Sequence, residues 1–187
     1  MSRLDDAVRA LEVGEVVGVP TDTVYGLAVD PTDRQAVTKV FELKGRPADR
    51  PLPILVADVA QAEELVMLSD AARDLAVRHW PGALTLVCPR RPGVPREFGD
   101  PDSGTVGVRV PDHPRCRELL EAAGPLAVTS ANRSGEDPVL DDVAARDLFG
   151  DGVAVYLSGR SPGGQSSTVV EVVEGRLRVL RRGPIRV

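Results

Sequence analysis

The segment 44–50 gathers three cations within seven residues, namely Lys44, Arg46 and Arg50. Gly45 and Pro47 shape the backbone between them. Arginine can grip phosphate oxygens with two parallel hydrogen bonds and lysine adds a point charge, so this segment could hold a polyphosphate. A solvated basic loop is the alternative interpretation, and it is the commoner one for such a cluster. Because the sequence G-x-x-x-x-G-K-[ST] does not occur in the chain, a kinase or GTPase of the Walker type is disfavoured.

Three further segments carry hydroxyl, amide or carboxylate groups close to glycine. Residues 21–25 could hold a small polar ligand, or they could form an ordinary capped turn. Residues 130–135 could bind phosphate through backbone N–H groups, and a plain strand-to-helix loop is equally consistent with them. Residues 159–167 are similar in composition, and such a segment is more often a flexible turn. Each of these signals is weak when taken alone.

The histidines and cysteines argue against metal or covalent chemistry. His79 and His113 each lack a second histidine at ligand spacing, so capping or turn roles are favoured and no metal site is expected. Cys88 and Cys116 do not belong to a close-set series of Cys and His residues of the kind that forms a zinc site or a disulfide framework, so neither is expected. No Ser-His-Asp or Cys-His arrangement can be argued, so hydrolysis through a covalent intermediate is disfavoured.

The composition is that of a globular chain, with 187 residues, 42% apolar and 27% charged residues. The net charge of −5 argues against a surface built to coat nucleic acid, and an aromatic content of 3% is low for base stacking. No apolar run approaches the ~20 residues that cross a bilayer, and the N-terminus lacks a signal-peptide pattern. We therefore expect a cytoplasmic protein that does not enter a membrane.

Apolar periodicity, caps and breakers predict the elements that must position these segments. Helices are expected at residues 3–13, 58–67, 69–79, 114–123 and 141–148, with one more that opens near residues 30–32 and ends before Gly45. Strands are expected at residues 15–20, 52–56, 83–88, 105–110, 125–129, 153–157, 168–173 and 176–180, the last two joined as a hairpin by Glu174-Gly175. This mixture predicts an α/β or α+β fold around one twisted, mixed sheet.

Seven sequence blocks occur in the order found in the YrdC-type threonylcarbamoyl-AMP synthases. They are residues 20–27 (PTDTVYGL), 44–52 (KGRPADRPL), 80–86 (WPGALTL), 105–111 (TVGVRVP), 129–135 (TSANRSG), 167–170 (STVV) and 180–183 (LRRG). The chain therefore resembles this family over essentially its whole length. The order of the seven blocks makes the resemblance specific, where any one block would be unconvincing.

The resemblance implies an α/β fold in a single domain over residues 1–187, with a twisted mixed sheet flanked by helices and a concave basic cavity. It implies a nucleotidyltransferase that condenses L-threonine, bicarbonate and ATP to threonylcarbamoyl-AMP and pyrophosphate, with Mg²⁺ accompanying ATP. A partner complex would then transfer the threonylcarbamoyl group to the adenosine beside the anticodon of certain tRNAs, and a weak contact with tRNA could accompany this step. Since the chain ends shortly after the last block, we expect the form without the additional C-terminal domain of longer members.

The resemblance also implies site residues. The threonine-binding positions are Thr23, Arg109 and Ser130, with Arg109 placed to pair with the substrate carboxylate. The ATP-binding positions are Arg46, Arg50, Thr105, Asn132, Ser167 and Arg182. Lys44 and Arg46 form the K-x-R signature and are the expected catalytic residues. We expect alanine at either position to abolish adenylate formation while leaving the fold intact, because a loop side chain contributes little to a core.

Two classes of function remain open at this point. One is the adenylate-forming enzyme, and the other is a non-catalytic RNA-binding or ribosome-associated module on the same fold. The K-x-R and S-x-N blocks favour the enzyme, because a surface that only held RNA backbone would not need a hydroxyl-lined pocket. The acidic net charge and the low aromatic content point the same way.

Overall fold

The computed structural model describes residues 3–45, 51–100, 102–173 and 176–187. The helices are α1 (Arg3–Glu12), α2 (Arg34–Lys44), α3 (Val59–Leu65), α4 (Asp70–His79), α5 (Pro114–Ala123) and α6 (Asp142–Phe149), the last followed by a short 3₁₀ turn (Gly150–Gly152). The strands are β1 (Val17–Val19), β2 (Gly26–Val29), β3 (Ile54–Leu55), β4 (Leu84–Pro89), β5 (Thr105–Arg109), β6 (Leu126–Ser130), β7 (Val155–Tyr156), β8 (Thr168–Val173) and β9 (Arg176–Arg181).

Side-chain caps explain why the predicted helices begin where they do. The carboxylates of Asp33, Asp58 and Asp141 accept backbone N–H bonds at the first turns of α2, α3 and α6, and the Ser69 hydroxyl does so for α4. Gly45 ends α2 in the left-handed conformation, with φ of +60°. All six predicted helices are confirmed, and α2 starts a few residues later than its opening turn suggested.

The strands form one mixed sheet in the order β7-β1-β2-β6-β3-β5-β4-β8-β9. The pairs β1/β7, β3/β5 and β4/β8 are parallel, and the other neighbours are antiparallel. The predicted mixed sheet is confirmed, although β2 was not foreseen. The predicted hairpin pairs as expected through β8 and β9, whereas its turn at residues 174–175 lies outside the described residues.

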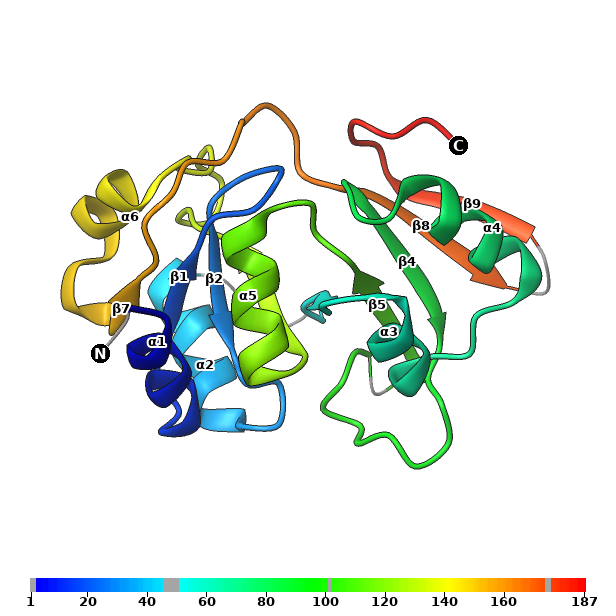
Figure 1. The fold of residues 1–187 in the computed structure, drawn as a ribbon, viewed down its shortest axis with the longest axis horizontal. Coiled ribbons are helices and arrows are strands. Elements are labelled where there is room, and N and C mark those ends of the chain that lie inside the picture. The colour runs from blue at the N-terminus through cyan, green and yellow to red at the C-terminus, as the bar shows by residue number, and fades with distance from the viewer. Residues whose placement is uncertain (1–2, 46–50, 101, 174–175) are drawn as a thin grey trace.

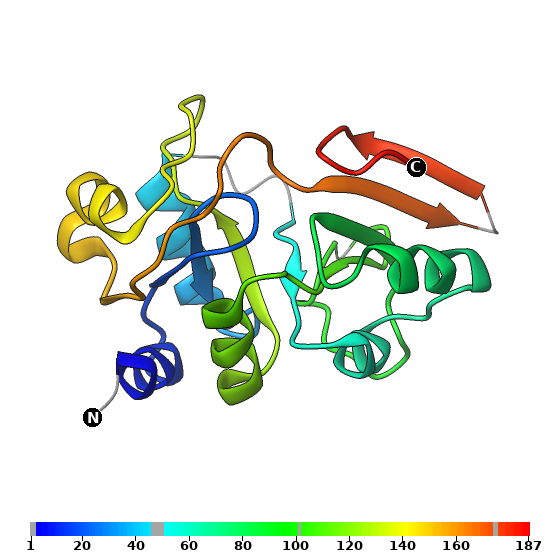
Figure 2. The ribbon, with the colours of Figure 1, turned by 45° about the horizontal axis from the view of Figure 1, so that its top comes forward.

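Helices cover the two halves of this sheet differently (Figures 1 and 2). Helices α1 and α5 lie together on one face of β1, β2 and β6, where Ala7, Leu11 and Leu119 pack into a buried cluster. Helices α2 and α6 cover the opposite face of the same strands. In the other half, α3 and α4 pack on one face of β4, β5 and β8, and the second face of those strands is left for the site described below.

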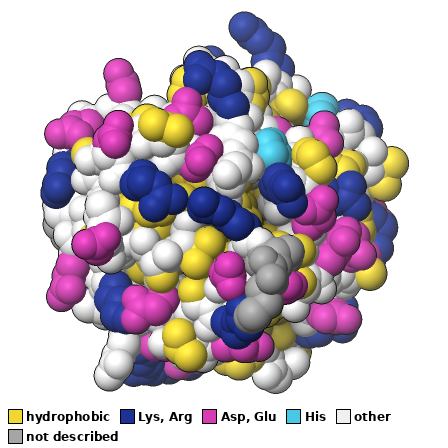
Figure 3. Space-filling view, turned by 60° about the vertical axis from the view of Figure 1, so that its left-hand side comes forward, with side chains coloured by type: hydrophobic (Ala, Val, Ile, Leu, Met, Phe, Trp, Pro, Cys, Tyr) yellow, Lys and Arg dark blue, Asp and Glu magenta, His cyan; other side chains and the backbone are white. Residues whose placement is uncertain are grey.

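The surface mixes both signs of charge. Lysine and arginine side chains alternate with aspartate and glutamate over the face drawn in Figure 3. None of the helices in the described ranges is long and apolar enough to cross a membrane.

Candidate functional site

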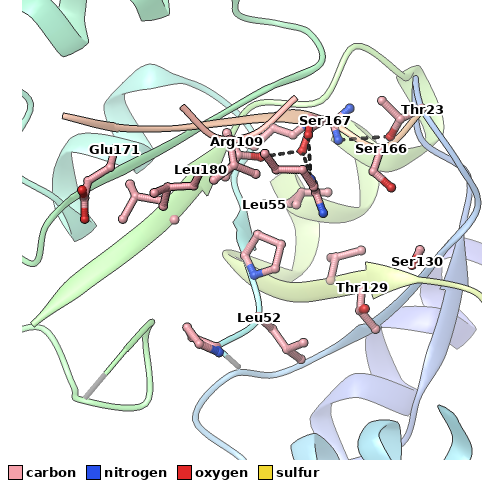
Figure 4. A pocket seen from close by; sticks show the side chains of 18 of the residues that line it. Thr23, Leu52, Leu55, Arg109, Thr129, Ser130, Ser166, Ser167, Glu171 and Leu180 are labelled. Atoms are coloured by element: carbon pink, nitrogen blue, oxygen red, sulfur yellow. Dashed lines mark hydrogen bonds between the residues drawn. The ribbon is translucent and has the colours of Figure 1, made fainter. Parts of the chain in front are cut away.

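A cavity of about 600 Å³ lies where the two halves of the sheet meet. One wall comes from the loop after β1 and from β6, and the other comes from β4, β5, β8 and β9. Figure 4 shows polar side chains of both walls turned toward this space, with leucines between them. The lining side chains include Thr21, Thr23, Leu52, Leu55, Thr85, Thr105, Arg109, Thr129, Ser130, Ser166, Ser167, Glu171, Arg178, Leu180 and Arg181.

Strand alternation aims these side chains at the cavity. Along β5, Thr105, Gly107 and Arg109 line the cavity, whereas Val106 and Val108 are fully buried on the opposite face. The neighbouring strands follow the same rule, with Thr85 and Val87 of β4 and Val169 and Glu171 of β8 on the cavity side. The apolar side of these strands therefore anchors the sheet to α3 and α4 while the polar side forms the floor of the site.

Arg109 is held by three hydrogen bonds at one end of the cavity. Its Nη2 donates to Asp22 Oδ1 at 2.5 Å, its Nη1 to Thr23 Oγ1 at 3.1 Å and its Nε to the Gly82 carbonyl at 2.9 Å. Burial lowers the pKa of the guanidinium, and the neighbouring Asp22 carboxylate opposes that effect. Of its five N–H groups, two have no partner within the described residues, so Arg109 can still receive a carboxylate.

Ser130 completes this end of the cavity. It stands at the end of β6, and its Oγ donates to Asn132 Oδ1 at 2.6 Å. The structure thus brings the three predicted threonine-site residues, Thr23, Arg109 and Ser130, to one cavity. Their binding role stays a prediction at this point.

Ser167 directly precedes β8 on the opposite wall and contacts both β4 and β9. Its Oγ is 2.8 Å from Thr85 Oγ1 and accepts a hydrogen bond from Arg181 Nη2 at 3.0 Å, while Arg181 Nε donates to the Ser167 carbonyl. Arg181 lines the cavity, whereas the predicted Arg182 lines a separate hollow of about 450 Å³. The nucleotide contact predicted for Arg182 stays a prediction, and of these two neighbouring arginines Arg181 is the one that lines the cavity.

Thr105, at the start of β5, also places a hydroxyl group in the cavity. Its Oγ1 lies 2.7 Å from Ser103 Oγ, which itself donates to Asp100 Oδ2. Since the single Ser103 proton goes to the carboxylate, the Thr105 hydroxyl is the donor to Ser103 and keeps lone pairs for a ligand. This arrangement agrees with a binding position without assigning its ligand.

Lys44 is the last residue of α2, and its buried side chain contacts Ser130 and Asn132. Its side chain is 3% exposed, and Nζ donates to the carbonyls of Ser130 and Asn132 and to Asn132 Oδ1. Val40, Phe41 and Lys44 share the buried face of the helix, three and four residues apart. The expectation that Lys44 belongs to a loop with little contribution to the core is therefore wrong.

Asn132 is engaged in the same cluster and does not line the cavity. Its Oδ1 accepts from Ser130 and Lys44, and its Nδ2 donates to the carbonyls of Arg133 and Glu136. This cluster fixes the loop that follows β6, and the ATP contact predicted for Asn132 stays a prediction. The predicted residues Arg46 and Arg50 lie outside the described residues.

Other chemistry finds little support in the described part of the chain. It contains no group of three or more His, Cys, Asp or Glu side chains that could hold a metal ion. Burial raises the pKa of both thiols, Cys88 and Cys116, to about 12, which disfavours either as a nucleophile.

Sequence reasoning named Thr21 only as part of the candidate segment 21–25, and it did not single out Thr85 or Arg181, which also line the cavity. The alternation of β4 carries a signal for Thr85, which shares a face with Val87. The alternation of β9 does not predict that Arg181 faces the cavity. The pairing register of β9 with β8 shifts between Val169 and Val170, and this shift interrupts the alternation.

Known proteins match this chain along nearly its whole length. The Sua5_yciO_yrdC family, described as telomere recombination, matches residues 9–183. The chain is 45% identical over 181 residues to a Mycobacterium tuberculosis protein, covering 96% of this chain and 83% of that protein. It is 38% identical to the threonylcarbamoyl-AMP synthase of Bacillus subtilis, covering 98% of this chain and 54% of that enzyme.

Solved structures agree with the sequence comparison. Sua5 of Pyrococcus abyssi, solved in complex with L-threonine, has a TM-score of 0.86 and 36% identity, and the match covers 97% of this chain and 54% of Sua5. The chain therefore spans about half the length of that protein. Escherichia coli YciO has a TM-score of 0.87 and 25% identity, with 96% of this chain and 88% of YciO covered. On the extent of these matches, the chain belongs to the Sua5/YciO/YrdC family.

Proposed function

We propose that this chain is an L-threonylcarbamoyladenylate synthase, which condenses L-threonine, bicarbonate and ATP to threonylcarbamoyl-AMP and pyrophosphate. The observation that carries the proposal is the convergence of Thr23, Arg109 and Ser130 at one end of a cavity whose other wall carries Ser167 and Arg181. The homologous Sua5 was solved with L-threonine, and relatives over nearly the whole chain are named threonylcarbamoyl-AMP synthases.

The division of the cavity suggests how the substrates lie. The amino acid carboxylate pairs with Arg109, which places the nitrogen inside the cavity for carbamate formation. ATP lies along the floor formed by β4, β5 and β8, with its phosphates toward Ser167 and Arg181. The carbamate oxygen then attacks the α-phosphorus, and nearby cations offset the charge of the departing pyrophosphate.

Mg²⁺ enters in this proposal as part of the ATP substrate. Magnesium commonly binds through one or two carboxylates together with substrate phosphates, so a protein cage of three ligands is not required.

The product fits a later step outside this chain. A mixed anhydride of a carbamate and AMP is an activated acyl donor, and we propose that a partner complex transfers its threonylcarbamoyl group to the adenosine beside the anticodon of certain tRNAs. Weak direct contact with tRNA, and a cytoplasmic location, belong to the same proposal.

Pyrophosphate release tests the function. Purified protein with Mg²⁺ and ATP is expected to release pyrophosphate only when L-threonine and bicarbonate are both present. Serine should support a slower reaction, since one methyl group adds only ~1–3 kcal/mol of discrimination. Folded protein that releases no pyrophosphate, yet binds RNA with a steep salt dependence, would instead be a binding module.

A further inference from the structure

The hydroxyl of Thr21 has its single proton committed. Thr21 is 3% exposed, and its Oγ1 donates to the Val24 carbonyl at 2.7 Å. The same oxygen accepts a hydrogen bond from the Thr23 backbone N–H at 3.1 Å. It therefore has no proton left to give to any other partner.

This commitment fixes the direction of the next hydrogen bond. Thr21 Oγ1 lies 3.0 Å from Thr23 Oγ1, so the proton between them must belong to Thr23. Thr23 Oγ1 also accepts from Arg109 Nη1, a contact drawn as a dashed line in Figure 4. The Thr23 hydroxyl, which lines the cavity, thus keeps one lone pair and no proton for a ligand.

We propose that Thr21 is a positioning residue that makes the Thr23 hydroxyl an obligate acceptor, and that this acceptor takes an N–H of the substrate nitrogen while Arg109 takes the carboxylate. The inference rests on the proposed function, because it assigns groups of an α-amino acid to that site. The two contacts together fix the orientation of the amino acid in the cavity.

Substrate chemistry favours the nitrogen as the partner. An ammonium group has only donors, and the carbamate nitrogen formed from it still carries one N–H, so the contact can persist through the reaction. A carboxylate oxygen cannot take this place, because two acceptors would face each other. Since the nitrogen and the carboxylate share one carbon, they can reach Thr23 and Arg109, which are themselves in contact.

The backbone around Thr21 has two further hydrogen bonds that do not use its hydroxyl. The Thr21 N–H donates to Ser161 Oγ at 3.0 Å, and the Gly163 N–H donates to the Thr23 carbonyl at 2.9 Å. Ser161 is fully buried in the segment that crosses the top of the molecule toward β8. Replacing only the Thr21 hydroxyl removes its bonds with the Val24 carbonyl and the Thr23 N–H and keeps these two contacts, so Thr21→Ser serves as the variant that retains the loop's hydrogen bonds.

A double-mutant cycle on threonine binding tests the inference. Calorimetry without ATP gives the threonine Kd of the wild type, Thr21→Val, Thr23→Val and the double variant. Thr21→Val should weaken threonine about tenfold, as the loss of one oriented hydrogen bond does, and Thr21→Ser should stay within about twofold of the wild type. In the Thr23→Val background, Thr21→Val should add less than about twofold, because Thr21 acts through Thr23.

Control measurements separate positioning from general damage. Thr38→Val removes a hydroxyl that donates to the Arg34 carbonyl on the exposed side of α2, and it should leave threonine affinity unchanged. The ATP Kd should stay within about twofold in Thr21→Val, since Thr21 does not act on the nucleotide. Additive losses in the cycle, equal loss of ATP affinity, or failure of Thr21→Ser to restore binding would each overturn the inference.

A substrate analogue tests the same point without any change at Thr21. The probe is 3-hydroxy-2-methylbutanoate of threonine configuration, in which a methyl group replaces the amino group. The wild type should bind it at least about tenfold more weakly than threonine, and Thr23→Val should narrow that ratio. A ratio that Thr23→Val leaves unchanged contradicts the inference, whereas a wild type that binds no threonine contradicts the proposed function itself.

Discussion

Arg109 and Asp22 form an ion pair whose side chains are only 6% and 14% exposed. A pair of this kind contributes modestly when intact, and removing one partner leaves a charge that is neither solvated nor compensated. Arg109 thus serves two purposes, because the contacts that hold it in place also leave two N–H groups for a ligand. Its function and its structural role must be separated by the choice of variant.

Arg109→Lys should raise the threonine Kd by more than about tenfold and leave ATP binding nearly unchanged. Lysine keeps the charge, but its single ammonium group cannot make these three divergent contacts and still offer two further N–H donors to a carboxylate. Calorimetric titration with each substrate measures both effects. Wild-type threonine binding in this variant would show that the guanidinium geometry is not used.

Arg109→Ala should in addition lower the free energy of unfolding by about 3–5 kcal/mol, because Asp22 is left unpaired. Urea denaturation measures this loss. Arg115→Ala, which breaks the exposed pair with Glu118, is the matched control and should cost less than about 1 kcal/mol. Equal losses of unfolding free energy in the two variants would show that the Arg109–Asp22 pair does not stabilise the fold more than an exposed pair does.

Lys44→Ala should lower the free energy of unfolding by about 2–3 kcal/mol, because it leaves the partly buried carbonyl oxygens of Ser130 and Asn132 without their charged donor. Lys39→Ala, on the same helix with a partly exposed side chain, should cost less than about 1 kcal/mol. Denaturation curves of the two variants check this difference. An unchanged stability in Lys44→Ala would mean that the cluster does not hold the loop.

Among the helices and strands, caps and breakers made the helices predictable, since Ser69 and Gly45 act on their immediate neighbours. The start of α2 was placed too early because its actual cap, Asp33, follows other turn residues at 30–32. Strand β2 escaped prediction because its four residues are all buried, so it shows no alternation of polar and apolar residues. The assignment of Arg182 in place of Arg181 has a related cause. A register shift between β8 and β9 decides which arginine faces the cavity, and local sequence does not encode that shift.

The end of β9 places two neighbouring arginines differently, and we expect them to differ in their effect on ATP binding. Arg181→Ala should weaken ATP binding by about tenfold or more, as the loss of one charge-assisted contact does. Arg182→Ala removes the neighbouring arginine, which lies outside the cavity, and should change the ATP Kd by less than about threefold. ATP titrations of the two variants distinguish them. A larger loss in Arg182→Ala would restore the prediction made from the sequence.

At the scale of the whole molecule, the site exists only because the sheet joins two halves. Thr23 and Ser130 come from one half, and Ser167 and Arg181 come from the other. No local pattern predicts that residues so far apart meet, and in the sequence only the order of the seven blocks indicated it. The burial of Lys44 likewise depends on tertiary packing, since cations at helix ends are more often solvated.

The proposed reaction joins threonine, bicarbonate and ATP in one product inside this cavity. The most direct test incubates the protein with L-threonine, Mg²⁺-ATP and bicarbonate labelled with carbon-13, and then identifies the nucleotide product by mass spectrometry. We expect threonylcarbamoyl-AMP that carries the heavy carbon, and no adenylate when bicarbonate is removed. Threonyl-AMP without the added carbon, or an adenylate that forms equally well without bicarbonate, would contradict this expectation.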